Sequence, residues 1–169
     1  FCKILFITLV CLFLRQTAPA QEKPNNLHQW GAISSFHGLP SDRVTAIAQT
    51  ADGILWFGTD KGLARYDGRR VQTVSAANLS NLKILSLKAA PGETLFIGTE
   101  NGAFRLENDT FFHIKETEKS AVNSILIDKE KVYLSTTGGA IFECSRAAIG
   151  SSWRVVKILA EAYPITSLG

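Results

Sequence analysis

The residue type best suited to chemistry in this chain is histidine, but the spacing of the three histidines does not place them in one site. His28, His37 and His113 lie in three separate segments of the sequence. None has the i, i+4 partner or the Cys-x-x-Cys pair that usually completes a protein metal site. We therefore interpret each histidine as a surface or turn residue, and we expect no metal site.

Acidic residues beside glycine raise the question of calcium binding. Asp52, Gly53 and Asp60 lack the D-x-D-x-D-G spacing of a calcium loop. Aspartate and glycine are favoured in tight turns, because aspartate bonds its own backbone and glycine tolerates a positive φ. Turn formation accounts for these residues. Gly138-Gly139 is interpreted as a hairpin turn, because no helix follows it to form a phosphate loop.

The remaining polar residues do not suggest a catalytic set. The sequence contains no G-x-S-x-G motif, and spacing alone supports no Ser/His/Asp combination. Glu116 and Glu118 lie in the charged stretch Lys115–Lys119, which is typical of a solvated connector. We expect no catalytic residue, no cofactor and no enzyme activity in this part of the protein. The ligand-binding residues and the activity of a longer protein stay open.

The first 20 residues have the pattern of a secretory signal peptide. Lys3 precedes the 11-residue apolar run Ile4–Leu14, and Ala18-Pro19-Ala20 supplies the small residues of a cleavage site. The apolar run is too short for a membrane span, which needs about 20 residues. We expect cleavage after Ala20, an exported location, and a polar lead over residues 21–29.

The net charge argues against nucleic-acid binding, and the cysteine content argues against an internal disulfide. Removal of the signal peptide takes away Lys3 and Arg15 but no acid, which lowers the formal net charge from +3 to +1. A nearly neutral chain has no electrostatic footprint for nucleic acid. Cys2 and Cys11 leave with the signal peptide, so Cys144 cannot form an internal disulfide. Its place in a strand-like run predicts a small buried core residue.

A repeat organises the rest of the chain. The sequence WFGT at residues 56–59 is echoed by FIGT at 96–99, 40 residues later, and by YLST at 133–136, a further 37 residues on. A glycine follows each motif after three residues, at Gly62, Gly102 and Gly139. A period near 40 that is built of strands and turns predicts a β-propeller, in which each repeat forms one blade.

Each copy contains four runs that are rich in strand-forming residues. The expected strands are Val44–Gln49, Ile54–Thr59, Leu63–Tyr66 and Val71–Val74; Ile84–Ala89, Thr94–Thr99, Ala103–Glu107 and Thr110–Ile114; and Asn123–Asp128, Val132–Thr136, Ala140–Cys144 and Trp153–Ile158. The repeats span about 43–81, 82–120 and 121–163, with a fourth starting at 164. We predict an all-β fold, a partial β-propeller of about three four-stranded blades plus the start of a fourth.

The two faces of these strands predict how the blades are arranged. Ile54, Trp56 and Gly58 lie on one face of a strand and Leu55 and Phe57 on the other, so both faces are apolar. Such strands suit blades that stack face to face, with the glycine allowing close approach of neighbouring backbones.

The segment before the first copy and the length of the chain bear on ring closure. Trp30–Phe36 has no repeat of its own, and we expect it to close the ring as the outer strand of the last blade; a loop anchored by Trp30 is the alternative. A closed propeller needs four to eight blades. We therefore interpret residues 30–169 as the N-terminal part of a longer propeller.

The first copy, together with Gly38-Leu39-Pro40-Ser41, resembles the two-component regulator propeller repeat. That repeat has the form GLPs-x-xVtaI-x-x-D-x-dG-x-lWiGT-x-x-GL-x-x-yd. The matching residues are Gly38, Leu39, Pro40, Val44, Ile47, Gly53, Leu55, Trp56, Gly58, Thr59, Gly62, Leu63, Tyr66 and Asp67. The chain departs from the pattern at Thr50, where the family has aspartate. The later copies depart at Phe96 and Ser135.

The resemblance implies the extracytoplasmic sensor region of a hybrid two-component or histidine kinase-type receptor. In such receptors the propeller senses an extracellular ligand, often a glycan, and transmits to a cytoplasmic output. The resemblance also implies a homodimer and a membrane anchor in downstream sequence. The alternative is an exported ligand- or glycan-binding propeller, lectin-like or lyase-like, without a signalling output. A quinone-dependent dehydrogenase is disfavoured, because the copies lack that family's tryptophan-docking pattern.

Overall fold

The computed structural model describes residues 31–76, 79–146 and 153–159. The expected signal peptide, the polar lead and the start of a fourth repeat lie outside the described residues. The chain divides into two compact units, Phe1–Ala32 and Ile33–Gly169. The fold below is that of the second unit.

Twelve strands form three four-stranded antiparallel sheets in the described part of the chain. The first sheet contains β1 (Val44–Gln49), β2 (Leu55–Thr59), β3 (Gly62–Tyr66) and β4 (Val71–Thr73). The second contains β5 (Ile84–Ala90), β6 (Thr94–Thr99), β7 (Gly102–Glu107) and β8 (Thr110–Ile114). The third contains β9 (Val122–Asp128), β10 (Lys131–Thr136), β11 (Ile141–Arg146) and β12 (Trp153–Leu159). The predicted three blades of four strands are confirmed.

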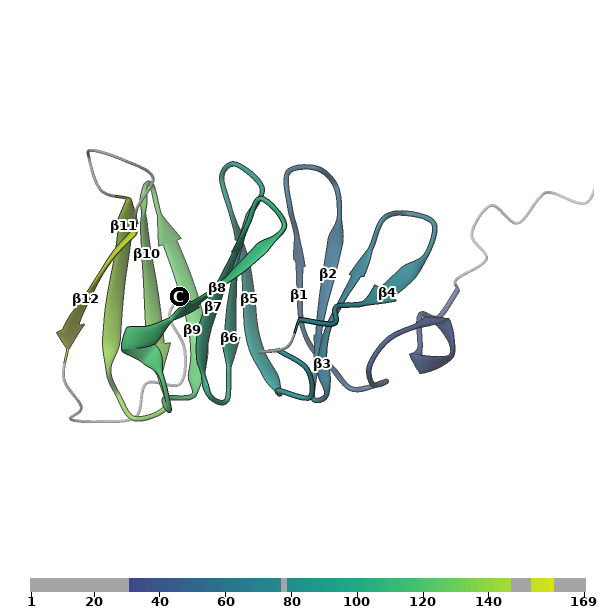
Figure 1. Cartoon of the computed structure of the whole chain (residues 1–169), viewed down its shortest axis with the longest axis horizontal. Helices are drawn as coiled ribbons and strands as arrows, with labels where there is room; N and C mark the ends of the chain where they lie inside the picture. Colours follow the sequence, from purple (N-terminus) through teal and green to yellow (C-terminus); the bar gives the residue numbers. More distant parts are fainter. Residues whose placement is uncertain (1–30, 77–78, 147–152, 160–169) are drawn as a thin grey trace, which may run out of the picture. The chain divides into compact units, whose positions relative to one another are not determined.

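Within each sheet the strands follow one another in chain order, so every blade is an antiparallel meander. The first strand of each sheet lies beside the first strand of the next, β1 beside β5 and β5 beside β9. Figure 1 shows the three sheets standing side by side in sequence order. This arrangement is that of consecutive propeller blades.

Apolar residues fill the space between neighbouring sheets. One core cluster joins Trp56 and Leu63 of the first sheet to Leu95 of the second, and another joins Phe96 of the second to Leu134 of the third. The second strands β2 and β6 are therefore buried on both faces, as the sequence predicted, whereas β1 is mostly exposed. Trp56 and Phe96 are 5% and 0% exposed and occupy equivalent register positions.

Glycine at the end of the second strand lets the sheets approach closely. A Cβ atom added at Gly58 would lie 2.5 Å from Cγ2 of Ile84 in the next sheet, and one added at Gly98 would clash with the Val122 carbonyl oxygen. The close approach predicted for this glycine is confirmed at both junctions. The threonine that follows bonds the adjacent turn, since Thr59 Oγ1 donates to the Gly62 carbonyl oxygen (2.8 Å).

The segment before β1 differs from the expected closing strand. Residues 31–34 have no regular structure, and Ser35–His37 form a 3-10 turn, η1. The Ser34 and Ser35 backbone N–H groups donate to His37 Nδ1 and to the Asp42 carboxylate. Residues 31–37 therefore form no strand here, but the last blade that the closing strand was expected to join is not among the described residues, so ring closure by Trp30–Phe36 stays a prediction.

Leu39 then fixes the lead-in to the first sheet. Its side chain is 5% exposed and packs with Phe57 and Ala64 on the face of the first sheet that is turned away from the second. Thr73 Oγ1 donates to the Gly38 carbonyl oxygen at 2.8 Å. Gly38 and Leu39 are therefore part of the folded unit.

Candidate functional site

Two of the grooves in the described part of the chain lie between neighbouring sheets, near the outer strands. The first groove, of about 290 Å³, is lined by Trp56, Arg65, Gln72, Thr73, Val74, Leu106, Asp109 and Phe111. The second groove, of about 270 Å³, is lined by Phe96, Arg105, Phe112, His113, Ile114, Lys115, Glu116, Cys144, Trp153 and Val155. Both grooves are therefore built from the last three strands of one sheet and the last two of the next.

The strand registers show that the two grooves are equivalent places in the repeat. Trp56 pairs with Arg65, which pairs with Gln72; Phe96 pairs with Arg105, which pairs with Phe112. On the opposite wall, Leu106 pairs with Phe111 in the first groove and Cys144 with Val155 in the second. Eight positions correspond in this way: Trp56 and Phe96, Arg65 and Arg105, Gln72 and Phe112, Thr73 and His113, Val74 and Ile114, Leu106 and Cys144, Asp109 and Trp153, Phe111 and Val155.

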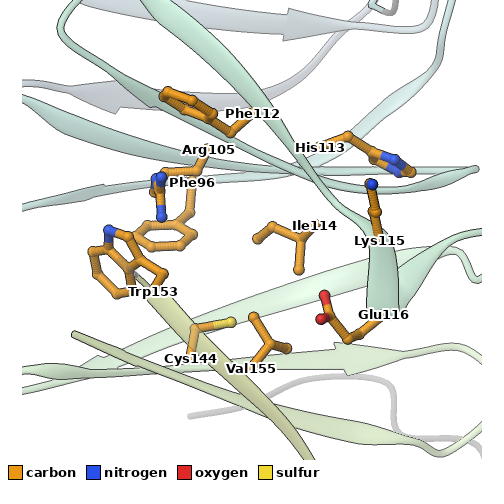
Figure 2. A pocket seen from close by; sticks show the side chains of 10 residues that line it. All are labelled: Phe96, Arg105, Phe112, His113, Ile114, Lys115, Glu116, Cys144, Trp153 and Val155. Carbon is orange, nitrogen blue, oxygen red and sulfur yellow. The ribbon is translucent and has the colours of Figure 1, made fainter. Parts of the chain in front are cut away.

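The second groove is the more aromatic of the two. Phe112 replaces the amide of Gln72, and Trp153 replaces the carboxylate of Asp109. Figure 2 shows Arg105 between Phe112 and the pair formed by Phe96 and Trp153. The rings of Phe96 and Trp153 meet edge to face, with centroids 5.2 Å apart. Strands β6, β7, β8 and β12 thus place an arginine and three aromatic rings at one end of the groove.

The Arg105 guanidinium lies over two of these rings. Its central carbon is 4.8 Å from the Phe112 ring centroid and 5.1 Å from that of Trp153. A guanidinium over an aromatic face is attracted by the negative charge density of the ring. Burial lowers the pKa of Arg105, while the charge of Glu107 raises it. The side chain is 13% exposed, so this is a largely buried cation at the wall of a cavity.

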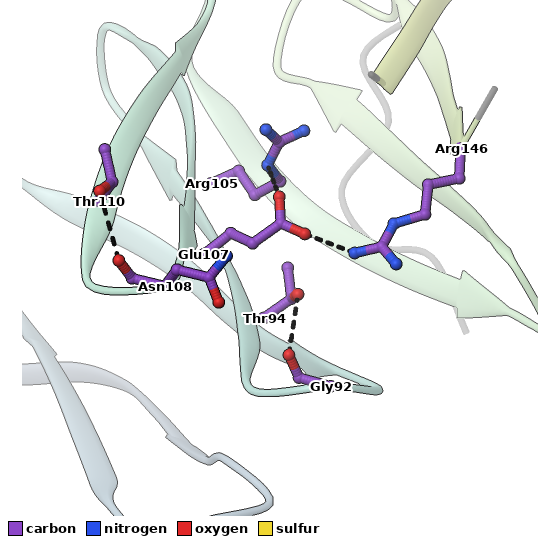
Figure 3. Close-up of polar contacts among 7 residues, drawn as sticks. All are labelled: Gly92, Thr94, Arg105, Glu107, Asn108, Thr110 and Arg146. Atoms are coloured by element: carbon purple, nitrogen blue, oxygen red, sulfur yellow. Dashed lines mark hydrogen bonds and ion pairs between the residues drawn. The ribbon is translucent and has the colours of Figure 1, made fainter. Parts of the chain in front are cut away.

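Glu107 connects the second sheet to the third. Its carboxylate lies 3.3 Å from Nε of Arg105 and forms a second ion pair with Arg146, on β11. Figure 3 shows Glu107 between the two arginines. Arg146 also lies over the Trp153 ring, 5.6 Å from its centroid. One carboxylate thus serves two guanidinium groups, and both contact the same indole.

The equivalent arginine of the first groove is held differently. Arg65 Nε donates to Oε1 of Gln72, its neighbour on β4, at 3.2 Å. This bond joins two strands of one sheet and does not cross to the next. The two grooves therefore share a backbone position but differ in whether the arginine pairs within its own blade or across the junction.

The tryptophan of the family motif is fixed by a polar pair that the second blade lacks. Trp56 Nε1 donates to Thr50 Oγ1 (3.0 Å), and Thr50 Oγ1 in turn donates to Asp52 Oδ1 (2.6 Å). At the equivalent positions the second blade has Phe96 and Ala90, both buried and apolar. The departure from the family pattern at Thr50 thus keeps a partner for the indole N–H, and the second blade needs none.

Two of the three histidines lie in the described residues, and the structure does not bring them together. His37 is exposed in η1, as expected. His113 lies on β8 rather than on a turn, with its ring 4.7 Å from that of Phe104 and its Nε2 atom buried without a hydrogen bond. The expectation of a surface or turn position is therefore wrong for His113, because strand alternation turns its ring toward Phe104.

The structure also tests the roles predicted for two aspartates and for the cysteine. Asp52 Oδ1 accepts the Ile54 backbone N–H at 3.2 Å, which confirms its role in the turn. Turn formation does not fully explain Asp60, because one of its carboxylate oxygens is buried without a hydrogen bond. Cys144 is 1% exposed, as predicted, and burial raises the pKa of its thiol to about 12.

Sequence reasoning missed Arg105, Glu107, Arg146 and Trp153 as a group. Aligning the repeats places Arg65 and Arg105 at one position, and this signal could have marked the pair. Within residues 31–76, 79–146 and 153–159, no three histidine, cysteine or acidic side chains gather as metal ligands. None of the helices in those ranges has the length and apolar character of a membrane span.

Comparison with known proteins agrees with this geometry. The model of the family described as two component regulator propeller matches residues 38–61, from the Gly38-Leu39-Pro40 lead-in to the turn after β2. The chain therefore carries a repeat of this family, as the sequence resemblance predicted. A comparison with curated proteins gave no match.

Solved structures of similar fold are extracellular domains from B. thetaiotaomicron. One, from BT4673, is described as that of a hybrid two component system and shares 25% identity and a TM-score of 0.58 over 73% of this chain. Another, from BT3049, carries the same description and shares 22% identity and a TM-score of 0.53 over 69% of this chain. A further structure of BT4673, described as a one component system, shares 24% identity and a TM-score of 0.56 over 72% of this chain.

The chain spans 17% of the length of each of these domains. The likeness supports the assignment of the three sheets described above to part of a β-propeller.

Proposed function

We propose that this chain is part of the exported ligand-sensing propeller of a bacterial two-component-type receptor. The observation that carries the proposal is the regulator propeller repeat at residues 38–61, in a chain whose blades are similar to an extracellular domain described as that of a hybrid two component system. The signal-peptide pattern of residues 1–20 supports export to the periplasm.

The receptor transmits to a cytoplasmic output, for which a histidine kinase is our proposal. A membrane anchor in downstream sequence connects the two, and the receptor works as a homodimer. A stack of blades with cores between them is stiff, so the ligand acts on the relative placement of two protomers rather than on the inside of a blade. Ligand binding biases such an equilibrium only by its different affinities for the two states. A tenfold difference corresponds to about 1.4 kcal/mol.

The test uses the complete protein that contains this propeller, in membrane vesicles. Autophosphorylation is measured with and without a panel of soluble glycans, the first ligand class to examine. We expect at least one glycan to change the rate, and removal of the propeller to abolish that response. If the complete gene encodes neither a membrane span nor a signalling domain, the receptor function is wrong and an exported binding propeller replaces it.

A further inference from the structure

The second groove contains a cation that its protein partners do not fully use. Arg105 is paired to Glu107 through Nε, at 3.3 Å. Among the described residues, no hydrogen bond or ion pair engages its two terminal nitrogens. Figure 3 shows these nitrogens pointing away from the Glu107 carboxylate. A guanidinium offers five N–H donors in a flat fork that matches a carboxylate, so Arg105 keeps the capacity for a further anionic partner.

The charge around this arginine is also uncompensated. Glu107 is shared by Arg105 and Arg146, so two positive groups face one negative group. At the other end of the groove Lys115 and Glu116 offset each other. The charges around this junction thus sum to an excess of about one positive charge, to which Arg146 contributes from outside the groove lining.

The walls beside the arginine suit a flat apolar group. Ile114 and Val155 line the cavity next to Arg105, and Figure 2 shows their side chains pointing into the same space. Phe96 lies behind this wall, fully buried. The cavity volume of about 270 Å³ is of the size that small ligands occupy. The first groove has a similar volume, but its opposite wall carries the carboxylate of Asp109, which would repel an anion.

We propose that the second groove binds a small carboxylate that has a flat apolar body. The carboxylate pairs with the terminal nitrogens of Arg105, while the body packs on Ile114 and Val155. Phe112 and Trp153 hold the guanidinium flat and shield it from water. Binding at this groove does not depend on an output domain; only its use as a sensory site rests on the function proposed above.

The test is an NMR titration of the chain at neutral pH with benzoate, followed at the indole N–H signals of its three tryptophans. Benzamide, which is neutral and of the same shape, is the matched probe. We expect benzoate to shift the Trp153 signal and to leave the Trp56 signal of the first groove in place. We expect benzamide to bind about tenfold more weakly or worse, the size of one lost charge-assisted hydrogen bond.

Variants then locate the site. Arg105→Gln removes the cation, and Arg65→Gln is the matched control at the equivalent position of the first groove. We expect the first change to weaken benzoate binding about tenfold or more and the second to leave it unchanged. Absence of a Trp153 shift, an equal response to benzamide, or an equal loss in both variants overturns the proposal. The comparison of the two probes needs no variant, so it decides the matter even if Arg105→Gln does not fold.

The result is separable from the signalling test. Benzoate binding is measured on the propeller chain itself, without a membrane or an output domain. If the complete protein does not signal but the Trp153 shift is present, the proposed receptor function fails and the binding site stands. If glycans drive autophosphorylation but benzoate does not bind, the receptor function stands and the proposed binding site fails.

Discussion

The two junctions between blades share one backbone design but are closed by different side chains. At the first, Arg65 bonds Gln72 within its own sheet. At the second, Arg105 pairs with Glu107, which reaches Arg146 on the neighbouring sheet, and both arginines lie over Trp153. The repeat therefore fixes where a side chain stands, while its neighbours on the outer strands decide whether it stabilises one blade or joins two.

The same contrast appears deeper in the core. The first blade fills the motif position with Trp56, whose N–H needs Thr50; the second fills it with Phe96 beside Ala90. In the first blade both residues are polar, and in the second both are apolar. The two positions are therefore coupled, because a buried hydrogen-bond donor without an acceptor costs free energy.

The largest expected effect comes from emptying the core of the second junction. Phe96→Ala should destabilise the chain by about 3–5 kcal/mol, because a fully buried ring that contacts Trp153 leaves a cavity. Trp56→Ala, the equivalent change at the first junction, should cost a similar amount. Denaturant unfolding of both variants measures this; a loss below about 1 kcal/mol for either would show that the ring is not part of the core.

A change at the close approach between sheets should have the next largest effect. Gly98→Ala places a Cβ atom against the Val122 carbonyl oxygen, so the sheets must move apart, at a cost of about 1–3 kcal/mol or more. Gly31→Ala is the control, because nothing lies within 4 Å of a Cβ atom there. Thermal unfolding of the two variants should separate them, and equal midpoints would contradict a tight junction.

The polar pair of the first blade, Trp56 and Thr50, can be replaced by apolar residues like those of the second blade. Thr50→Ala should cost about 1–3 kcal/mol, because the buried Trp56 N–H loses its acceptor. Adding Trp56→Phe removes the donor and should recover part of this loss. A double-mutant cycle by urea unfolding measures the coupling. Purely additive losses would mean that the hydrogen bond does not link the two positions.

The ion pairs of the second junction should contribute less to the free energy of unfolding than the changes above. Glu107→Gln leaves Arg105 and Arg146 without their shared carboxylate, and we expect a loss of about 1–2 kcal/mol, since the acid is 15% exposed. The control is Lys131→Ala, which breaks the more exposed pair with Glu143 within the third sheet and should cost less than Glu107→Gln. Equal losses in chemical unfolding would remove the distinction between pairs within and across blades.

The smallest expected effect concerns Cys144, which stands where the first groove has Leu106. Because burial raises the pKa of its thiol to about 12, the folded chain keeps this thiol neutral and unreactive at about pH 8.5, the usual thiol pKa. Its contribution to stability is complete below the unfolded value and is lost as pH rises toward the folded value. Alkylation by iodoacetamide, mapped by mass spectrometry, should require denaturant; rapid labelling of the native chain would contradict this.

Much of the fold followed from the sequence, because its signals are local. Alternation and turn residues placed all twelve strands within about two residues, and the recurring motif with Gly62 and Gly102 gave the repeat. Ring closure by Trp30–Phe36 stays a prediction, because a strand needs a partner and the last blade is not among the described residues. His113 was misplaced, because the strand face on which a side chain lies depends on the exact register.

The sequence by itself determined the blade, because each blade is made of neighbouring segments whose pairing depends on short turns. It also determined that both faces are buried, since no polar alternation interrupts WFGT or FIGT. Only the tertiary structure decided which side chains meet across a junction. Glu107 and Arg146 are 39 residues apart, and their pairing depends on the stacking of two sheets. The second groove, with Arg105 between Phe112 and Trp153, exists for the same reason.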